Sequence, residues 1–227
     1  MLNRESDMVA PAAKWMRSAG LLAKAEFITP WGICDLVGLR FNPDKVAHRL
    51  HLRQTRAVNS ITRAALLLQI PDVETRESTT LKKLVGQCAA AVPEAVVSEE
   101  TFRLIADRFV ISSSGRLQKV NGWMPMQDRL VAVELKLSRV EEAMHQALNN
   151  LGFAEESYVG LPAEMARRVA SNASRWSGFF DAGIGLLSVA RRECKVLVEA
   201  RKTPGRADAA VQVYCVEKFW RTRLKGS

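Results

Sequence analysis

The chain has 227 residues, of which 48% are hydrophobic, so it can bury one large or two small cores and is not a disordered chain. No apolar run reaches 18 residues, and no membrane span is expected. Four scattered cysteines without zinc-ligand spacing and the absence of an apolar leader predict a cytoplasmic protein with reduced thiols. The net charge of +9 favours a polyanionic partner, commonly nucleic acid.

The first third of the chain predicts a helix followed by two antiparallel strands. Residues 10–24 carry a helical apolar stripe, and residues 26–28 form a short strand. Pro30-Trp31-Gly32 is a turn signal, and the apolar residues of 33–39 predict a second strand. This second strand contains one acid, Asp35, at a position where an unpaired carboxylate would be costly.

Residues 40–122 have a different character. The segment 40–53 is polar and basic and is interpreted as a connection that leaves the core. Helices are predicted at 54–69 and 79–91, and a third at 98–108 after a Ser98 start signal. Residues 109–121 then predict a strand, a Ser/Gly turn and a second strand.

The stretch 130–136, LVAVELK, is the second strand of chemical interest. Glu134 and Lys136 stand two apart in an apolar run, so they share one face of the strand. Ser138 and Glu141 have the spacing of a capping box, which predicts that a helix over 139–153 follows directly. The acid and the base therefore lie where a strand passes into a helix.

The remaining elements alternate between strands and helices. A strand at 157–161 is followed by a basic helix at 163–176 and by strands at 183–189 and 194–201. The expected fold class is therefore α/β, with a mixed central sheet flanked by helices.

An acid in one apolar strand, then Glu-x-Lys in another followed by a helix, resembles the PD-(D/E)XK nuclease superfamily. Asp35 matches the family's Asp, and Glu134 and Lys136 match its (D/E)XK. The sequence departs from the family in having Cys34 at the position of the Pro. Glu134 also lies 99 positions after Asp35, whereas the family commonly has a short hairpin between its two acids.

The long gap predicts an inserted module. Three helices followed by a hairpin resemble a winged helix-turn-helix, with 98–108 as its recognition helix and 109–121 as its wing. The resulting organisation has a restriction endonuclease-like core, 1–52 and 123–227, and an inserted small helical or winged-helix domain, 53–122. In this interpretation four basic residues would meet DNA: Arg103, Arg108, Arg116 and Lys119. The acids on the same helix argue against tight contact with phosphates.

The nuclease resemblance implies an Mg²⁺ site, with Mn²⁺ as a substitute. Asp35 and Glu134 would each give a carboxylate oxygen, and the carbonyl of Leu135 would add a ligand. Lys136 would assist the attacking water in hydrolysis of a phosphodiester bond. Gln146 on the following helix and Glu26 across the hairpin are further candidates, although both types of residue are common in solvent.

Several alternatives remain open from the residues alone. Glu134 and Lys136 can instead form an ion pair on an edge strand, with Asp35 capping a turn. The protein would then be a catalytically silent nuclease-fold protein that binds DNA or protein, or a winged-helix transcriptional regulator. The leading hypothesis is a metal-dependent DNA endonuclease, and cutting both strands of a duplex would suggest a homodimer, because two strands need two sites.

Overall fold

The computed structural model describes residues 2–202 and 205–225. Within these residues the chain forms two compact units, and each is described by itself. Unit 1 contains residues 2–40, 127–208 and 222–225, and unit 2 contains residues 41–126 and 209–221.

Unit 1 is built on a six-stranded sheet with the order β1-β2-β6-β7-β8-β9. Its strands are β1 (Leu22–Thr29), β2 (Gly32–Phe41), β6 (Gln127–Leu135), β7 (Glu156–Pro162), β8 (Gly185–Val189) and β9 (Cys194–Val198). The pairs β1–β2 and β8–β9 are antiparallel, whereas β6–β7 and β7–β8 are parallel. The fold is therefore α/β with a mixed sheet, and this prediction is confirmed.

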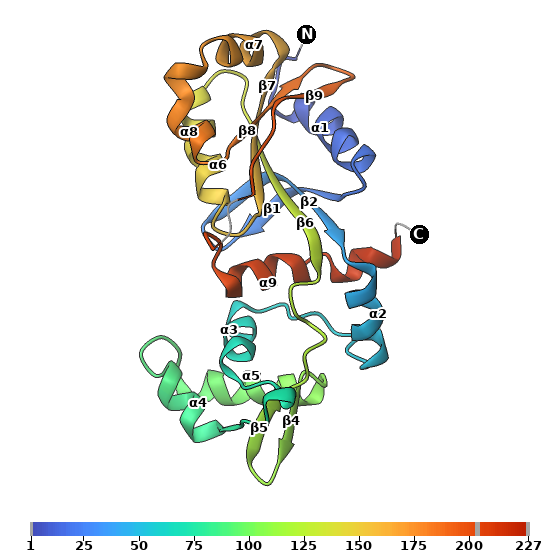
Figure 1. Ribbon diagram of the computed structural model, residues 1–227, viewed down its shortest axis with the longest axis vertical. Coiled ribbons are helices and arrows are strands. Elements are labelled where there is room, and N and C mark those ends of the chain that lie inside the picture. The colour runs from blue at the N-terminus through green and yellow to red at the C-terminus, as the bar shows by residue number, and fades with distance from the viewer. Residues whose placement is uncertain (1, 203–204, 226–227) are drawn as a thin grey trace. The chain divides into compact units, whose positions relative to one another are not determined.

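Helices pack on both faces of this sheet because side chains on a strand alternate between its faces. The helices of unit 1 are α1 (Ser6–Ser18), α6 (Val140–Asn150), α7 (Ala163–Ser171) and α8 (Ser177–Asp181), with a 3₁₀ turn η2 (Ala173–Trp176). Helix α1 packs its buried methionines against Val131, Val133 and Leu135 of β6. On the other face, α6 and α7 cover β7 and β8 (Figure 1). Glu134 points to the α6 face, between two residues that point to α1.

Two helix boundaries in unit 1 correct the sequence prediction. The first helix ends at Ser18, and Leu22 already begins β1, because Gly20 adopts a left-handed φ of 75° that stops the helix. Helix α6 starts at Val140, with Arg139 as its N-cap and no side-chain capping bond, so the capping box predicted at Ser138 is not formed.

Unit 2 combines helices with a small three-stranded sheet of order β3-β5-β4. Its elements are α2 (Pro43–His51), α3 (Ile61–Gln69), η1 (Val73–Thr75), β3 (Thr79–Thr80), α4 (Leu81–Cys88), α5 (Glu94–Ala106), β4 (Val110–Ser113), β5 (Arg116–Lys119), α9 (Ala209–Glu217) and the start of η3 (Trp220–Lys225). Three helices and a hairpin follow one another as expected, but α5 begins four residues before Ser98. Pro93 precedes this helix with extended backbone and so provides its start.

The structure places the domain boundaries differently from the prediction of 53–122. Helix α2 belongs to unit 2, and so does α9, which comes from near the end of the chain. Arg49 of α2 and Glu217 of α9 form a buried ion pair, with Nη2 and Oε2 3.0 Å apart, and are 0% and 1% exposed. The predicted connection at 40–53 is thus a helix whose buried residue is an arginine, which hydrophobic periodicity does not reveal.

Candidate functional site

Asp35 and Glu134 lie on neighbouring strands of unit 1, β2 and β6. The Asp35 carboxylate accepts a hydrogen bond from the backbone N–H of Leu135, with an O···N distance of 2.7 Å. This bond fixes the acid of β2 beside the peptide group that follows Glu134. Two acids 99 residues apart in sequence are therefore brought together in the middle of the sheet.

Glu134 is 3% exposed and held in place by an amide. Asn150, at the end of α6 and 4% exposed, donates a hydrogen bond from Nδ2 to Oε1 of Glu134 at 2.6 Å. Burial raises the pKa of Glu134 to about 7, the Asn150 hydrogen bond lowers this pKa, and the charge of Asp35 raises it. At neutral pH this carboxyl is poised between its neutral and charged forms.

Lys136 is 8% exposed, and its ammonium group lies between two further acids. Nζ is 3.7 Å from Oε2 of Glu5 and 3.9 Å from Oε1 of Glu142. Glu5 also accepts a hydrogen bond from the N–H of Leu137 at 3.4 Å. The positive charge of Lys136 slightly lowers the pKa of Glu134. The ion pairs of Lys136, however, are with Glu5 and Glu142.

A small cavity of about 170 Å³ opens beside Glu134, between the β1–β2 turn and the end of α6. Gln146, Asn150 and Trp31 are among the residues that line it. The buried Oε1 of Gln146 has no hydrogen-bond partner among the described residues. A cavity of this size suits a hydrated ion or one group of a substrate rather than a whole small ligand, for which about 300 Å³ or more is usual. Gln146 thus lines the same cavity as Glu134.

Glu26 lies in β1 but is not part of this cluster. The β1–β2 register places its backbone opposite Asp35, between the pairs Ala25↔Leu36 and Phe27↔Cys34. Its side chain is exposed and makes no hydrogen bond or ion pair with the residues that the structure describes. The residue has a left-handed φ of 50° inside the strand, which is strained for a side chain with a Cβ.

The acids of this site have few companions that could bind a metal ion. Among the described residues, no group of three or more His, Cys, Asp or Glu side chains is arranged to hold one. This excludes from the described ranges the four-ligand protein sites typical of structural zinc. Mg²⁺, however, is usually held by one or two carboxylates and keeps several waters. Asp35 and Glu134 fit this pattern, because two neighbouring carboxylates repel one another unless a cation lies between them.

The four residues predicted to meet DNA lie in unit 2 and have different surroundings. Arg103 is engaged by two acids of its own helix, Glu99 and Glu100. Arg108 is exposed, and Arg116 donates a hydrogen bond to Ser78 at 3.1 Å. A fourth residue, Lys119, has its ammonium 5.5 Å from the centre of the Trp123 ring. The DNA-contact prediction therefore applies best to Arg108 and Arg116, and it stays a prediction.

Asn150 and Glu5 belong to the site and were not predicted from the sequence. Asn150 follows Gln146 by four residues, so the two share a helix face, and this spacing is a signal that the sequence does contain. Glu5 precedes α1 and lies 132 residues from its hydrogen-bond partner Leu137. No local pattern distinguishes it from an ordinary acid in the first turn of a helix.

Comparisons with known proteins add little to this geometry. No protein-family model matches the sequence, and no curated protein matches it. Among solved structures, a protein of unknown function from Silicibacter pomeroyi is similar at 11% identity, with a TM-score of 0.47. The similarity covers 99% of this chain and 88% of the other. A likeness this distant shows nothing about the function of this chain.

None of the helices in the described ranges combines the length and the hydropathy that a bilayer span requires.

Proposed function

We propose that the protein is a metal-dependent nuclease that hydrolyses phosphodiester bonds in DNA. One observation carries the proposal: Asp35 and Glu134 meet beside the Leu135 peptide, with Lys136 two residues further on. The excess of basic over acidic residues supports a polyanionic substrate.

Each side chain has a distinct part in this proposal. Asp35 and Glu134 would hold Mg²⁺, and the hydrogen bond from Asn150 would keep the Glu134 carboxylate in position. A bound Mg²⁺ supplies Lewis acidity and lowers the pKa of a coordinated water. Lys136 would orient the attacking water and stabilise the negative charge that develops on the phosphate. Gln146 offers its unpartnered Oε1 as an acceptor to a water in the cavity.

The test is a cleavage assay on supercoiled plasmid, linear duplex, single strands and branched DNA, each with Mg²⁺, Mn²⁺ or EDTA. We expect cutting with either metal and none in EDTA. Lys136→Ala and Asp35→Ala should each lower the rate by about 100-fold or more, since each removes a charge from the reacting centre. Lys14→Ala, which removes an exposed lysine from α1, is the matched control and should cut at the wild-type rate.

Two results would contradict the proposal. Cutting that survives in both variants would belong to a contaminant or to another site. DNA binding without any cutting, unchanged by EDTA and by both variants, would favour a catalytically silent binding protein or a winged-helix regulator. Conversion of plasmid to linear product without a nicked intermediate would support a homodimer with two sites.

A further inference from the structure

A second cavity lies in unit 1 at the carboxyl ends of the parallel strands β6 and β7. Its volume is about 370 Å³, within the range of small-ligand pockets, about 300 to 1,000 Å³. Ser138 and Val140 reach it from the segment after β6, and Met165 and Val169 reach it from α7, which follows β7 directly. In open α/β sheets, the crevice outside the carboxyl ends of the strands is where ligands usually bind.

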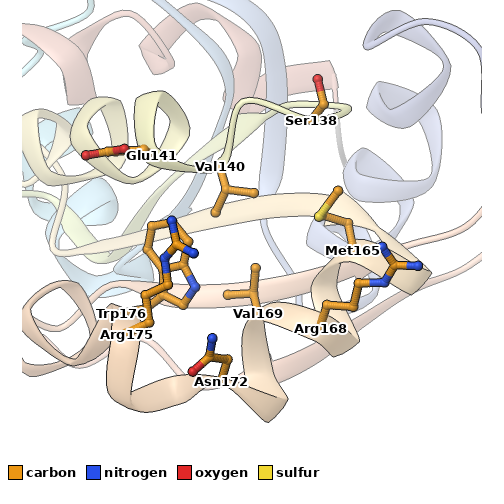
Figure 2. A pocket seen from close by; sticks show the side chains of 9 residues that line it. All are labelled: Ser138, Val140, Glu141, Met165, Arg168, Val169, Asn172, Arg175 and Trp176. Carbon is orange, nitrogen blue, oxygen red and sulfur yellow. The ribbon is translucent and has the colours of Figure 1, made fainter.

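The interior of this cavity is apolar. Figure 2 shows Val140 and Val169 facing one another across it, with Trp176 at one side. Met165 lies toward the opposite side in the same view. Two branched aliphatic side chains and an indole form a slot suited to a flat, weakly polar ring.

The rim of the cavity is basic. Arg168 and Arg175 both line it and are exposed. Arg168 is paired with Glu164 at 2.6 Å, but these side chains are 70% and 73% exposed, so the pair is weak and readily exchanged for another anion. The Arg175 guanidinium lies 5.3 Å from the centre of the Trp176 ring. Asn172 adds an amide to the rim (Figure 2).

Glu141 is the one acid among the residues that line the cavity. In Figure 2 its carboxylate points away from the side chains of the slot and the rim. The rim therefore keeps an excess of positive charge from its two arginines.

We propose that this pocket binds one nucleotide. The base would lie in the slot between Val140 and Val169 against Trp176. The phosphate would be bound at the basic rim by Arg168 and Arg175, whose exposed side chains extend from opposite sides of the pocket (Figure 2). An apolar slot alone would select any flat ring, and two arginines alone would select any anion. A nucleotide carries a flat base and a phosphate in one molecule, so it can occupy the apolar slot and the basic rim at the same time.

The pocket is separate from the carboxylate site. Val140 begins α6 and Asn150, the partner of Glu134, ends it, so about 15 Å of helix lies between them. Nucleotide binding should accordingly need neither Mg²⁺ nor the Glu134 carboxylate.

The experiment measures binding by calorimetry in EDTA, with dAMP, deoxyadenosine, inorganic phosphate and the single strand (dA)₄ as probes. We expect dAMP to bind at least about tenfold tighter than deoxyadenosine or phosphate, because only dAMP fills both halves. Arg168→Gln and Arg175→Gln should each weaken dAMP binding by about tenfold, the usual effect of losing one charged hydrogen bond. Arg17→Gln, an exposed arginine of α1, is the matched control and should bind like the wild type.

The outcomes distinguish the possible ligands. Phosphate binding as tightly as dAMP would overturn the proposal in favour of a plain anion site, and no binding of dAMP or (dA)₄ would overturn it outright. If (dA)₄ binds more tightly than dAMP and both arginine variants lose this binding, the pocket binds a nucleotide within a strand. If (dA)₄ and dAMP bind equally tightly, the pocket binds a free nucleotide. Because binding is measured in EDTA, where no cutting is expected, failure of the nuclease proposal and failure of this one can be told apart.

Trp176 provides a spectroscopic check. Its indole packs partly against the core of the α6–α7 face, so Trp176→Leu can perturb folding. The arginine variants change exposed side chains and leave that core intact. Quenching of tryptophan fluorescence by dAMP, absent in Arg175→Gln, is the expected signature.

Discussion

Glu134 is a buried acid, and burial makes the charged form of its carboxyl unfavourable. It stands in an apolar strand, its carboxyl accepts one hydrogen bond from Asn150, and the charge of Asp35 is close. A buried carboxylate is costly unless a cation or hydrogen-bond donors compensate its charge. Acids with a raised pKa in such surroundings are common at functional sites.

The pKa of Glu134 makes stability depend on pH. The folded-state pKa is about 7, against an ordinary value of 4.5, so between these values the folded protein holds more protons than the unfolded one. The free energy of unfolding must therefore fall as pH rises from about 4.5 to 7 and level off above that. Replacing Glu134 by Gln keeps an oxygen for Asn150 and removes the charge.

We expect Glu134→Gln to be more stable than the wild type in EDTA. The gain at pH 8 should exceed the gain at pH 5 by on the order of 2 kcal/mol. Urea denaturation at both pH values measures the difference, with the exposed Glu193→Gln as the control. Parallel pH profiles for Glu134→Gln and the wild type would show that this carboxyl titrates normally.

The site was predictable from the sequence to the extent that its residues break a pattern. Asp35 and Glu134 interrupt apolar strands, and Lys136 shares a face with Glu134, so all three stand out. Asn150 and Glu5 do not stand out, because a polar residue on or beside a helix ordinarily faces solvent. These two contact the site only because α6 and the residues before α1 pack near the end of β6.

At the scale of elements, β1 contains the strained residue Glu26. A left-handed φ is open to glycine at no steric cost, whereas a residue with a Cβ loses about 1 kcal/mol or more there. Because β1 pairs with β2, the strand of Asp35, this strain lies one strand away from the site.

Substituting Glu26 by Gly should raise the free energy of unfolding by about 0.5–1 kcal/mol, since relief of strain outweighs the added freedom of the unfolded chain. Lys24→Gly, at a position of the same strand with negative φ, should lower it by about 1 kcal/mol. Urea melts of the two variants give the comparison, and destabilisation of similar size in both would mean that Glu26 is unstrained.

Most strands were predictable, because alternating or continuous apolar runs follow directly from their burial. Two helices of unit 2, α2 and α9, were not predicted, because neither has a single apolar stripe. Helix α2 buries Arg49 rather than an apolar stripe, and α9 has apolar residues on several sides. The signal for α2 was its cap: Asn42 accepts a hydrogen bond from the N–H of Lys45, and Pro43 occupies the first turn.

At the scale of the whole molecule, unit 2 is assembled from two distant segments joined by Arg49 and Glu217. Glu217 also accepts a hydrogen bond from the N–H of Val58 at 2.7 Å, and the guanidinium of Arg49 lies 3.8 Å from the centre of the Trp220 ring. Removing one member of a buried pair leaves the other charge without compensation.

Glu217→Gln should therefore destabilise unit 2 by roughly 3–5 kcal/mol. Hydrogen exchange followed by mass spectrometry measures the effect region by region. Amides of α5, β4 and β5 should exchange faster, whereas those of β6 and β7 should keep their protection. Gly185→Ala is the reciprocal control, because a Cβ there would lie 2.3 Å from the ring of Tyr158 in unit 1. Faster exchange of β6 and β7 in Glu217→Gln would show that the pair supports both units.

The split origin of unit 2 has a consequence for synthesis on the ribosome. Residues 41–126 are translated long before residues 209–221. Until Glu217 has been made, the guanidinium of Arg49 lacks its carboxylate partner, so unit 2 stays incomplete while the later strands of unit 1 are translated. A ribosome stalled near residue 205 would therefore display unit 2 in a protease-sensitive state, and unit 2 would close only after residues 209–221 have been translated and have left the ribosome.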